Sequence, residues 1–338
     1  MTSPLAVRCT ALCLAALAAA TALTGCSNSD EPAAQQSPTA QSTGWTYTDG
    51  AGLAIKLESQ PTRIAAFADY AIGLLSYGIT PVAIFGREDV ATDQRFADYD
   101  LAEVAIVGNT YGEIDLEALA GAEPELIVTG IYPTDREGTL SLEEPYYAVA
   151  DMEQQLQLEK IAPIAVVRIG GAGAQVVEDL NELARALGAD PGAIDQARAA
   201  YYAAADTLTA AAQESDLELT MIYGSPDGIY LVKPQDEPST ELYTSLGLTF
   251  TDLNPDGDFY WDVYSWENAA QTMTGDVLLV FTEGYQEADF REQPTFAAHP
   301  ALAAGQVYTW QDAAFDYNSQ AAQFKYLTEI LLNSKDVA

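Results

Sequence analysis

The chain has 338 residues and a mass of 36.1 kDa, enough for two domains of the usual size of about 100–200 residues. Hydrophobic residues make up 49% of it, which excludes a chain that is disordered throughout. Asp and Glu number 50 against 14 Lys and Arg, a formal charge of −36. So few cations cannot cluster against phosphates, which excludes nucleic-acid binding and disfavours direct adsorption to anionic lipid.

The first residues are predicted to be an export signal. Arg8 precedes the apolar run Cys9–Leu23, which is too short for an ordinary membrane span of about 20 residues. The run ends in Leu23-Thr24-Gly25-Cys26, and small residues directly before a cysteine are typical of a bacterial lipobox. We therefore expect residues 1–25 to be a lipoprotein signal peptide. The exported protein is then lipid-anchored through Cys26 to the outer face of the cytoplasmic membrane. The alternative is an ordinary signal peptide with a chance cysteine.

The cysteine positions agree with this interpretation. Cys9, Cys13 and Cys26 are the three cysteines of the chain, and all lie in or at the end of the signal. The mature chain has no other thiol, which excludes a disulfide framework, a cysteine metal site and a thiol nucleophile. Residues 26–43 are rich in Ser, Ala, Gln, Pro and Thr and are expected to form a flexible tether.

Residues 44–171 are predicted to form an N-terminal α/β lobe. Trp45–Thr48 and Ala54–Leu57 are expected to pair as a hairpin with a Gly-containing loop. Apolar runs typical of strands then alternate with helical patterns, which indicates a largely parallel sheet. The strands are expected at Arg63–Phe67, Val82–Phe85, Val104–Val107, Leu126–Thr129 and Ile164–Val167, and the helices at Asp69–Tyr77, Asp115–Ala120 and Tyr146–Glu159.

Residues 172–188 are predicted to be an inter-lobe spine helix. Its apolar residues fall on one stripe, and Gly188 and Pro191 supply helix stop signals. Residues 189–338 are expected to form a C-terminal α/β lobe, with helices at Ala193–Ala212 and Gln320–Leu332. Its strands are expected at Leu219–Tyr223, Ile229–Val232, Thr249–Leu253, Val277–Phe281 and Val307–Thr309.

The two halves repeat one arrangement. Glu117 begins a helix that leads to the strand Leu126–Thr129, and Glu267 begins a helix that leads to the strand Val277–Phe281. The period is too long for a solenoid. The predicted fold class is therefore α/β, with two related Rossmann-like lobes joined by one long spine helix.

Catalytic and metal-binding motifs are absent from the sequence. His299 is the only histidine, and its Ala-His-Pro context is typical of a turn. No Gly-x-Ser-x-Gly elbow or His-Glu-x-x-His is present, and one imidazole cannot form a multi-histidine zinc site. We expect neither an enzyme nor a resident cofactor nor a protein-bound metal, although a glycosidase-like carboxylate pair stays open.

Ligand-binding residues are predicted in the loops after the strands, because ligands bind beyond the carboxyl ends of parallel strands. These loops carry aromatic rings and a few cationic donors. Such a set predicts a cleft for a bulky, partly polar small molecule. The alternative for each ring is half-buried packing. The candidates are Tyr70, Arg87, Tyr111, Tyr132 and Arg168 in the first half and Ser225, Trp261, Tyr264, Tyr285 and Phe315 in the second.

Short motifs in a specific order resemble the substrate-binding lipoproteins of bacterial iron-siderophore ABC transporters, which have the class III periplasmic-binding fold. The resemblance covers nearly all of residues 44–332 and departs at Glu125, where the family more often has Asp. The motifs are Pro61–Ile64, Leu75–Val82, Phe85-Gly86, Val107-Gly108, Glu113–Leu119, Pro124–Ile127, Ser265–Asn268 and Gly305–Tyr308.

The resemblance implies two rigid lobes that close modestly on a ferric siderophore and deliver it to the permease of an ABC importer. It implies that Glu117 and Glu267 pair with arginines of the permease; the alternative is that these acids only stabilise helix N-termini. A siderophore can fill the coordination shell of iron, so iron is expected only as part of the bound complex. We expect a monomer.

The charge of the chain favours one class of siderophore. A strongly anionic ferric catecholate needs a basic cleft, and the plausible cleft cations are only Arg87, Arg136, Arg168 and Lys233. A ferric hydroxamate is neutral or cationic and fits better. Heme, with a tyrosine as axial ligand, and cobalamin stay open. In other classes, a secreted carboxylate-dependent hydrolase and an adhesion lipoprotein remain as alternatives.

Overall fold

The computed structural model describes residues 44–310 and 312–337. The predicted signal peptide, the predicted tether and the predicted lipidation site Cys26 lie outside these residues. The described residues form one compact unit. None of the helices in residues 44–310 and 312–337 is long and apolar enough to cross a membrane.

Strands and helices alternate along the described residues as the sequence predicts. The strands are β1 (Trp45–Thr48), β2 (Ala54–Leu57), β3 (Ile64–Phe67), β4 (Ala83–Phe85), β5 (Ala105–Gly108), β6 (Leu126–Ile131), β7 (Ile164–Arg168), β8 (Glu218–Ser225), β9 (Gly228–Val232), β10 (Thr249–Phe250), β11 (Trp261–Tyr264), β12 (Val277–Phe281) and β13 (Val307–Trp310). The helices are α1 (Ala68–Leu75), α2 (Leu116–Gly121), α3 (Met152–Ile161), α4 (Gly173–Ala186), α5 (Pro191–Gln213), α6 (Pro238–Ser245), α7 (Glu287–Glu292), α8 (Pro300–Ala304) and α9 (Tyr317–Asn333), with 3₁₀ turns η1 (Gln94–Phe96) and η2 (Trp266–Thr272).

The N-terminal sheet has the order β5-β4-β3-β6-β7, and all its neighbours are parallel. Its central strands are continuous apolar runs: every residue of β3 and β6 is buried. Such runs are typical of strands covered on both faces. The carboxyl ends of these strands therefore meet at one edge, where the loops after β3, β4 and β6 begin.

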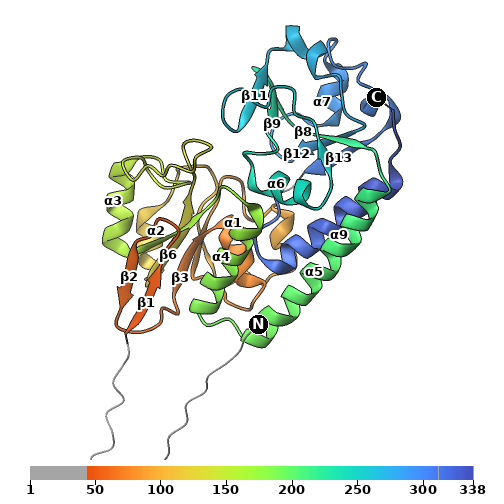
Figure 1. Cartoon of the computed structure of the whole chain (residues 1–338). Coiled ribbons are helices and arrows are strands. Elements are labelled where there is room, and N and C mark those ends of the chain that lie inside the picture. Colours follow the sequence, from red (N-terminus) through yellow and green to blue (C-terminus); the bar gives the residue numbers. More distant parts are fainter. Residues whose placement is uncertain (1–43, 311, 338) are drawn as a thin grey trace, which may run out of the picture. The chain divides into compact units, whose positions relative to one another are not determined.

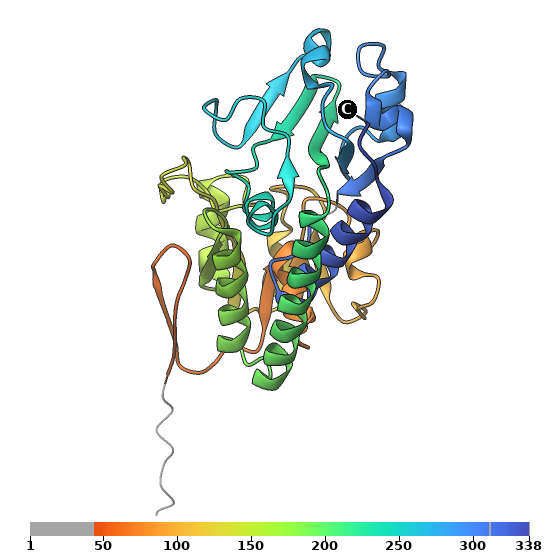
Figure 2. The same ribbon diagram turned by 45° about the vertical axis from the view of Figure 1, so that its right-hand side comes forward.

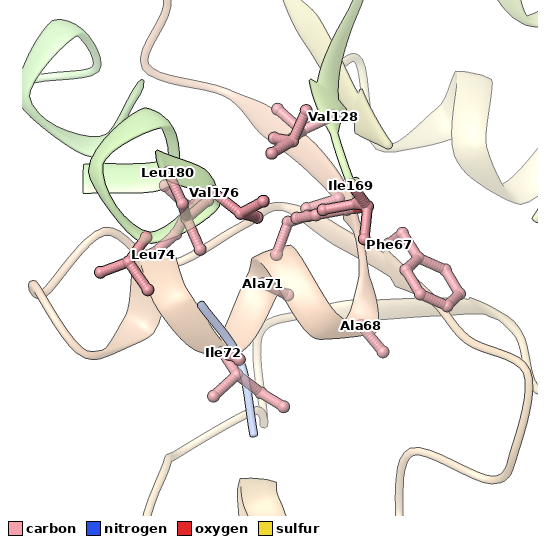
Figure 3. Packing of buried hydrophobic residues seen from close by; sticks show 14 of the residues in the cluster. Phe67, Ala68, Ala71, Ile72, Leu74, Val128, Ile169, Val176 and Leu180 are labelled. Carbon is pink, nitrogen blue, oxygen red and sulfur yellow. The ribbon is translucent and has the colours of Figure 1, made fainter. Parts of the chain in front are cut away.

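The core beside this sheet is built by close packing of α1 on α4. Figure 3 shows Leu74 of α1 and Leu180 of α4 together with Val176 and Ile169 in one apolar cluster. A methyl group on Gly73 of α1 would lie 2.9 Å from Cδ2 of Leu180. The glycine thus allows the two helices to approach closely, which fixes the start of α1 at the strand edge.

The C-terminal sheet is mixed. Its order is β11-β9-β8-β12-β13, with β10 paired to β8. The pairs β8–β12 and β12–β13 are parallel, whereas β8–β9 and β9–β11 are antiparallel. The strand β11 lies in a segment for which the sequence predicts a loop that carries Trp261 and Tyr264.

The helix that connects the two sheets differs from the predicted one. The segment predicted as the spine, 172–188, contains α4, which packs against α1, β7 and α6. The chain crosses to the second sheet in α5 instead, which lies beside α9 (Figures 1 and 2). With 23 residues α5 spans about 35 Å. The reason is that Gly188, at φ +98°, ends the first helix, and Asp190 caps a second, longer one.

Candidate functional site

A cavity of about 390 Å³ lies between residues of the two halves, within the range of about 300–1,000 Å³ that is usual for ligand pockets. Rings dominate its lining, with one guanidinium and three carboxylates among them. The lining residues are Asp69, Tyr70, Arg87, Tyr132, Pro133, Tyr147, Ile169, Met221, Glu237, Ser239, Phe259, Tyr260, Trp261, Phe281, Asp312, Ala313, Ala314 and Phe315.

The N-terminal side of the cavity is a cluster of tyrosines at the strand edge. Tyr70 lies in the first turn of α1, and Tyr132 follows β6. Tyr147 is at the centre: its ring centroid lies 4.7 Å from that of Tyr132 and 5.3 Å from that of Phe67. Its backbone is fixed by two bonds to β6, because its N–H donates to the carbonyl of Gly130 (2.9 Å) and its carbonyl accepts from Oγ1 of Thr129 (2.6 Å).

These tyrosines stay protonated at neutral pH. Burial raises the pKa of Tyr147 to about 12 and raises the pKa values of Tyr70 and Tyr132 well above the ordinary value. The cluster therefore presents neutral phenols, which offer flat apolar faces and hydroxyl groups to a ligand.

Among the described residues, Arg87 is the one cation that lines the cavity, and acids of the second half already surround it. Its Nη2 donates to Oδ2 of Asp312 (2.6 Å), and its Nε lies 2.8 Å from Oε1 of Glu283. Its Nη1 donates to the hydroxyl of Tyr147 (3.1 Å). Burial alone would lower the pKa of Arg87, but Asp69 and Asp312 raise it. The guanidinium is thus charged, and its charge is balanced within the cavity.

Arg95, behind the cavity, is engaged in the same way. Its guanidinium lies 2.5 Å from Oδ1 of Asp69 and 2.7 Å from Oδ2 of Asp93. Burial would raise the pKa of Asp69, but Arg95 and Arg87 lower it. Asp69 is therefore an ionised carboxylate that reaches the cavity already paired.

The C-terminal side of the cavity is aromatic. Tyr260 and Trp261 have ring centroids 5.5 Å apart, and Trp261 and Phe281 have centroids 5.9 Å apart. Phe259 and Phe315 complete this side. Tyr260 has φ +73°, which is uncommon for a residue with a side chain and marks a conformation that its surroundings must hold.

Five of the ten predicted ligand residues line this cavity: Tyr70, Arg87, Tyr132, Trp261 and Phe315. Tyr111 lies outside the lining, with its ring 5.3 Å from that of Tyr147 and 48% exposed. Arg168 donates from Nη2 to the carbonyl of Gly138 (3.0 Å).

The other three lie at the far end of the β8–β9 hairpin. Tyr264 pairs with Ile229, and Ser225 pairs with Gly228. Tyr285 stacks on Trp266, at 5.6 Å between centroids. Trp266 in turn donates from Nε1 to the carbonyl of Ser225 (2.9 Å). These rings pack with Phe290 and Phe296 in a second apolar cluster, not in the cavity.

The predicted cleft cations are also engaged by the protein. Lys233 is buried and lies 2.9 Å from Oδ1 of Asp262. Arg136 donates from Nε to Oδ1 of Asp236 (2.8 Å). With Arg87 and Arg168, each of the four predicted cations has an acid or carbonyl partner.

Sequence reasoning missed several residues of the lining, chiefly Tyr147, Phe259, Tyr260, Glu237 and Asp312. Tyr147 falls inside the helix predicted for Tyr146–Glu159, but α3 begins only after Asp151, whose side chain accepts from the N–H of Gln154. Asp before a helical run is an N-cap signal, so the later start was available from the sequence.

The two acids predicted to dock on a permease are exposed. Glu117 lies in the first turn of α2, and Glu267 in the first turn of η2. Hydrogen bonds from its own N–H and from the Ser265 hydroxyl lower the pKa of Glu267, so it is charged at neutral pH. Both positions are open to a partner.

His299 is fully buried in the C-terminal half, at the N-cap of α8. Among the residues described, no group of three or more His, Cys, Asp or Glu is placed to hold a metal ion.

Comparisons with solved structures give a consistent result. DesE, a ferric-siderophore receptor protein from Streptomyces coelicolor, is 27% identical with a TM-score of 0.76 over 87% of this chain and 100% of its own. The siderophore periplasmic binding protein from the fuscachelin gene cluster of Thermobifida fusca is 23% identical, with a TM-score of 0.60 over 81% and 97%. FhuD from Vibrio cholerae, a siderophore binding protein bound to Fe³⁺-Desferal, is 18% identical, with a TM-score of 0.57 over 81% and 99%. At such low identity the last two show the fold alone.

A comparison with curated proteins gives no match. The model of the periplasmic binding protein family matches residues 64–314, about three quarters of the chain. The resemblance seen in the sequence and the expected α/β fold are therefore confirmed, as is the expectation of a binding protein and not an enzyme. This chain belongs to the periplasmic binding protein family and has the fold of its class III members.

Proposed function

We propose that this protein captures a ferric siderophore in the cavity between its two halves and delivers it to the permease of an ABC importer. Family membership supports an extracytoplasmic binding role, and the similarity to DesE, a ferric-siderophore receptor, supports the ligand class. The cavity fits such a ligand, because its flat aromatic sides and hydroxyl groups suit a bulky molecule with a polar periphery. The siderophore coordinates the iron, which is cargo and not a cofactor.

The charge of the cavity favours a hydroxamate siderophore, and one observation carries this choice. Within the described part of the chain, Arg87 is the only cation in the lining, and Asp312 and Glu283 already balance it. Asp69, which is already paired with Arg95, and Glu237, whose pKa burial raises, add no positive charge to the lining. A strongly anionic ferric catecholate would enter a site with no unbalanced positive charge and would lose its hydration there. A neutral or cationic ferric hydroxamate avoids that cost.

Heme and cobalamin are the alternative ligands within the family. Heme would need an axial ligand, and the tyrosines of the cavity are the residues that could supply one. Burial raises the pKa values of these phenols, which makes a phenolate ligand costly. The structure therefore favours a ligand that brings its own complete coordination shell.

A tryptophan-fluorescence titration tests the ligand. The described residues begin at Gly44, so the chain without residues 1–26 retains all of them, and Trp261 reports on the cavity. Ferric ferrioxamine B, a ferric catecholate and heme are added in parallel. We expect saturable quenching at micromolar or lower concentration by the hydroxamate alone. Preference for the catecholate or heme would overturn the hydroxamate assignment but keep the importer role. No response to any of them would contradict the siderophore proposal.

Anchoring and docking complete the proposed role. The Cys26 lipobox predicts attachment to the outer face of the cytoplasmic membrane, and a Cys26→Ala chain is expected to lose membrane partitioning. The exposed acids Glu117 and Glu267 are proposed to pair with arginines of the permease, where charge sets orientation and association rate.

The docking role is tested by uptake of labelled siderophore in cells that carry Glu117→Arg with Glu267→Arg. Uptake is expected to fall at least tenfold. Two ion pairs are lost, each worth about 1 kcal/mol or less in an exposed setting, and the new arginines also repel those of the permease. Glu153 and Glu287 are matched controls, because each is an exposed acid in the first turn of a helix, one in each half. Equal uptake by both double variants would contradict the docking role.

A further inference from the structure

Arg136 of the N-terminal half inserts its guanidinium into a loop of the C-terminal half, Asn254–Tyr260, which carries Phe259 and Tyr260 to the cavity. Its Nε donates to Oδ1 of Asp236 (2.8 Å) and its Nη2 to Oδ2 (2.9 Å), so the pair is bidentate. Its Nη1 and Nη2 also donate to the carbonyls of Gly257 and Asp258, each at 3.0 Å. One side chain thus binds a carboxylate and two carbonyls across the two halves.

The same carboxylate fixes the aromatic side of the cavity. Asp236 is 7% exposed, and its Oδ2 accepts from the N–H of Tyr260 (2.9 Å). Tyr260 has φ +73°, so this bond helps to hold a backbone conformation that is costly for a residue with a side chain. Arg136 and Tyr260 therefore share one oxygen atom, and the position of the tyrosine ring is coupled to the contact between the halves.

The rest of the loop is held from within the C-terminal half. Lys233 donates from Nζ to the carbonyl of Asn254, and its N–H donates to the carbonyl of Tyr260 (2.9 Å). Gln235 donates from Nε2 to the carbonyl of Pro255 (2.6 Å). The carbonyls of Gly257 and Asp258 instead accept hydrogen bonds from Arg136. Without Arg136 the loop keeps these other anchors, so the fold does not depend on it.

We propose that Arg136 is a positioning residue for ligand retention: by binding Asp236 and the 257–258 carbonyls it holds Phe259 and Tyr260 against the cavity when the halves are together. This inference rests on the proposed function. Separation of the halves breaks the Arg136 contacts and leaves the loop only its anchors within the C-terminal half, so release of the ligand is coupled to a loss of loop contacts at residues 257–258. Arg136 itself touches no ligand, because it lies outside the cavity lining.

The test is the ligand dissociation rate of Arg136→Gln, followed by stopped-flow tryptophan fluorescence with ferric ferrioxamine B. We expect a rate about tenfold above that of the wild type, which corresponds to about 1.4 kcal/mol, with a melting temperature changed by less than about 2 °C. Arg136→Lys keeps the charge but not the bidentate geometry and is expected to give an intermediate rate.

Arg291→Gln is the matched control. Arg291 donates to Oε1 of Glu287 from Nε (2.9 Å) and Nη2 (2.6 Å) and to the carbonyl of Leu302 (2.7 Å), so it has the same kind of partners but lies wholly within the C-terminal half. Its variant is expected to release ligand at the wild-type rate. A wild-type rate in Arg136→Gln, or an equal increase in Arg291→Gln, would overturn the proposal.

A second arm needs no ligand and separates this inference from the proposed function. All three cysteines lie within residues 1–26, so cysteines introduced by Glu144→Cys and Asp227→Cys in the chain without those residues can carry spin labels, one on each half. We expect Arg136→Gln to broaden the distance distribution between the labels toward longer values, and Arg291→Gln to leave it unchanged. An unchanged distribution in Arg136→Gln overturns the inference even if no siderophore binds.

Discussion

The two sheets supply aromatic residues to the cavity in different ways. In the N-terminal sheet all neighbouring strands are parallel, so the residues that follow β3, β4 and β6 meet at one edge, and Tyr70, Arg87 and Tyr132 all line the cavity. In the C-terminal sheet β9 and β11 run antiparallel to their neighbours. There the start of β11 faces the cavity with Trp261, while its end carries Tyr264 to the opposite end of the hairpin.

The consequence is that the C-terminal half has two aromatic clusters with different roles. Trp261 belongs to the cavity, and Trp266 belongs to the second apolar cluster with Tyr285, Phe290 and Phe296. The two tryptophans are five residues apart in sequence and lie at opposite ends of β11, since Trp261 begins the strand and Trp266 follows its end. Strand direction alone does not select the ligand residues, because β12 is parallel to both of its neighbours and Tyr285 after it still packs in the second cluster.

The largest expected effect comes from the junction of the two halves, where α4 packs against α6. A methyl group on Gly173 of α4 would lie 1.9 Å from the carbonyl oxygen of Pro238 and 2.8 Å from Cβ of Leu242, both at α6. Gly173→Ala is expected to lower the free energy of unfolding by about 3 kcal/mol or more, because backbone and not a flexible side chain must move. Urea denaturation measures it.

Gly121→Ala in α2 is the matched control, because a methyl group there meets nothing within 4 Å. It is expected to be neutral or to stabilise the protein by less than about 1 kcal/mol. Equal stability of the two variants would show that α4 does not hold the halves together at this point.

The second cluster is tested by Trp266→Ala. This change removes the ring stacked on Tyr285 and the bond from Nε1 to the Ser225 carbonyl. We expect a loss of about 2–3 kcal/mol in the free energy of unfolding, with siderophore affinity within about twofold of the wild type. A large loss of affinity in a folded variant would place this cluster in the binding site.

The cavity cluster is tested by the same substitution at Trp261. Trp261→Ala removes a ring that faces the cavity beside Tyr260 and Phe281. We expect affinity for ferric ferrioxamine B to fall about thirtyfold, or about 2 kcal/mol, with a loss of stability of about 1 kcal/mol. Isothermal calorimetry and urea denaturation should show that Trp261→Ala loses mainly ligand affinity, whereas Trp266→Ala loses mainly stability. If Trp261→Ala binds as the wild type does, the cavity is not the binding site.

The fold class could be predicted because apolar strand runs, the helical patterns between them, and the Gly and Pro residues that end them depend only on local chemistry. The strand boundaries at Val277–Phe281 and Trp45–Thr48 match those observed. What it could not predict is pairing direction, since β11 is a strand only through its antiparallel contact with β9. Nor could it predict that Asp312 and Glu283 come from separate loops to balance Arg87, because such contacts are made between segments distant in the chain.

The smallest expected effect is a loss of folding stability at acid pH. It originates in the C-terminal half, because His299, the only histidine of the chain, lies there. The ring is fully buried: Nδ1 accepts from the N–H of Ala301 (3.1 Å), so Nε2 carries the proton and donates to the carbonyl of Thr274 (3.0 Å). Burial lowers the pKa of His299 below its ordinary value of 6.5.

The neutral ring therefore stabilises the native state fully above about pH 6.5, where the unfolded chain is also neutral. As the pH falls below that value, the unfolded state binds a proton that the native state does not, and stability falls by at most about 1.4 kcal/mol per pH unit until the native pKa is reached. We expect urea denaturation at pH 7.5, 6.5 and 5.5 to show this loss in the wild type. His299→Asn keeps a short acceptor for the N–H of Ala301 but does not titrate in this range. Both proteins share all other acids, so the difference between their free energies of unfolding should shrink as the pH falls. A difference that stays constant would mean that the imidazole is protonated in the native state or accessible to solvent.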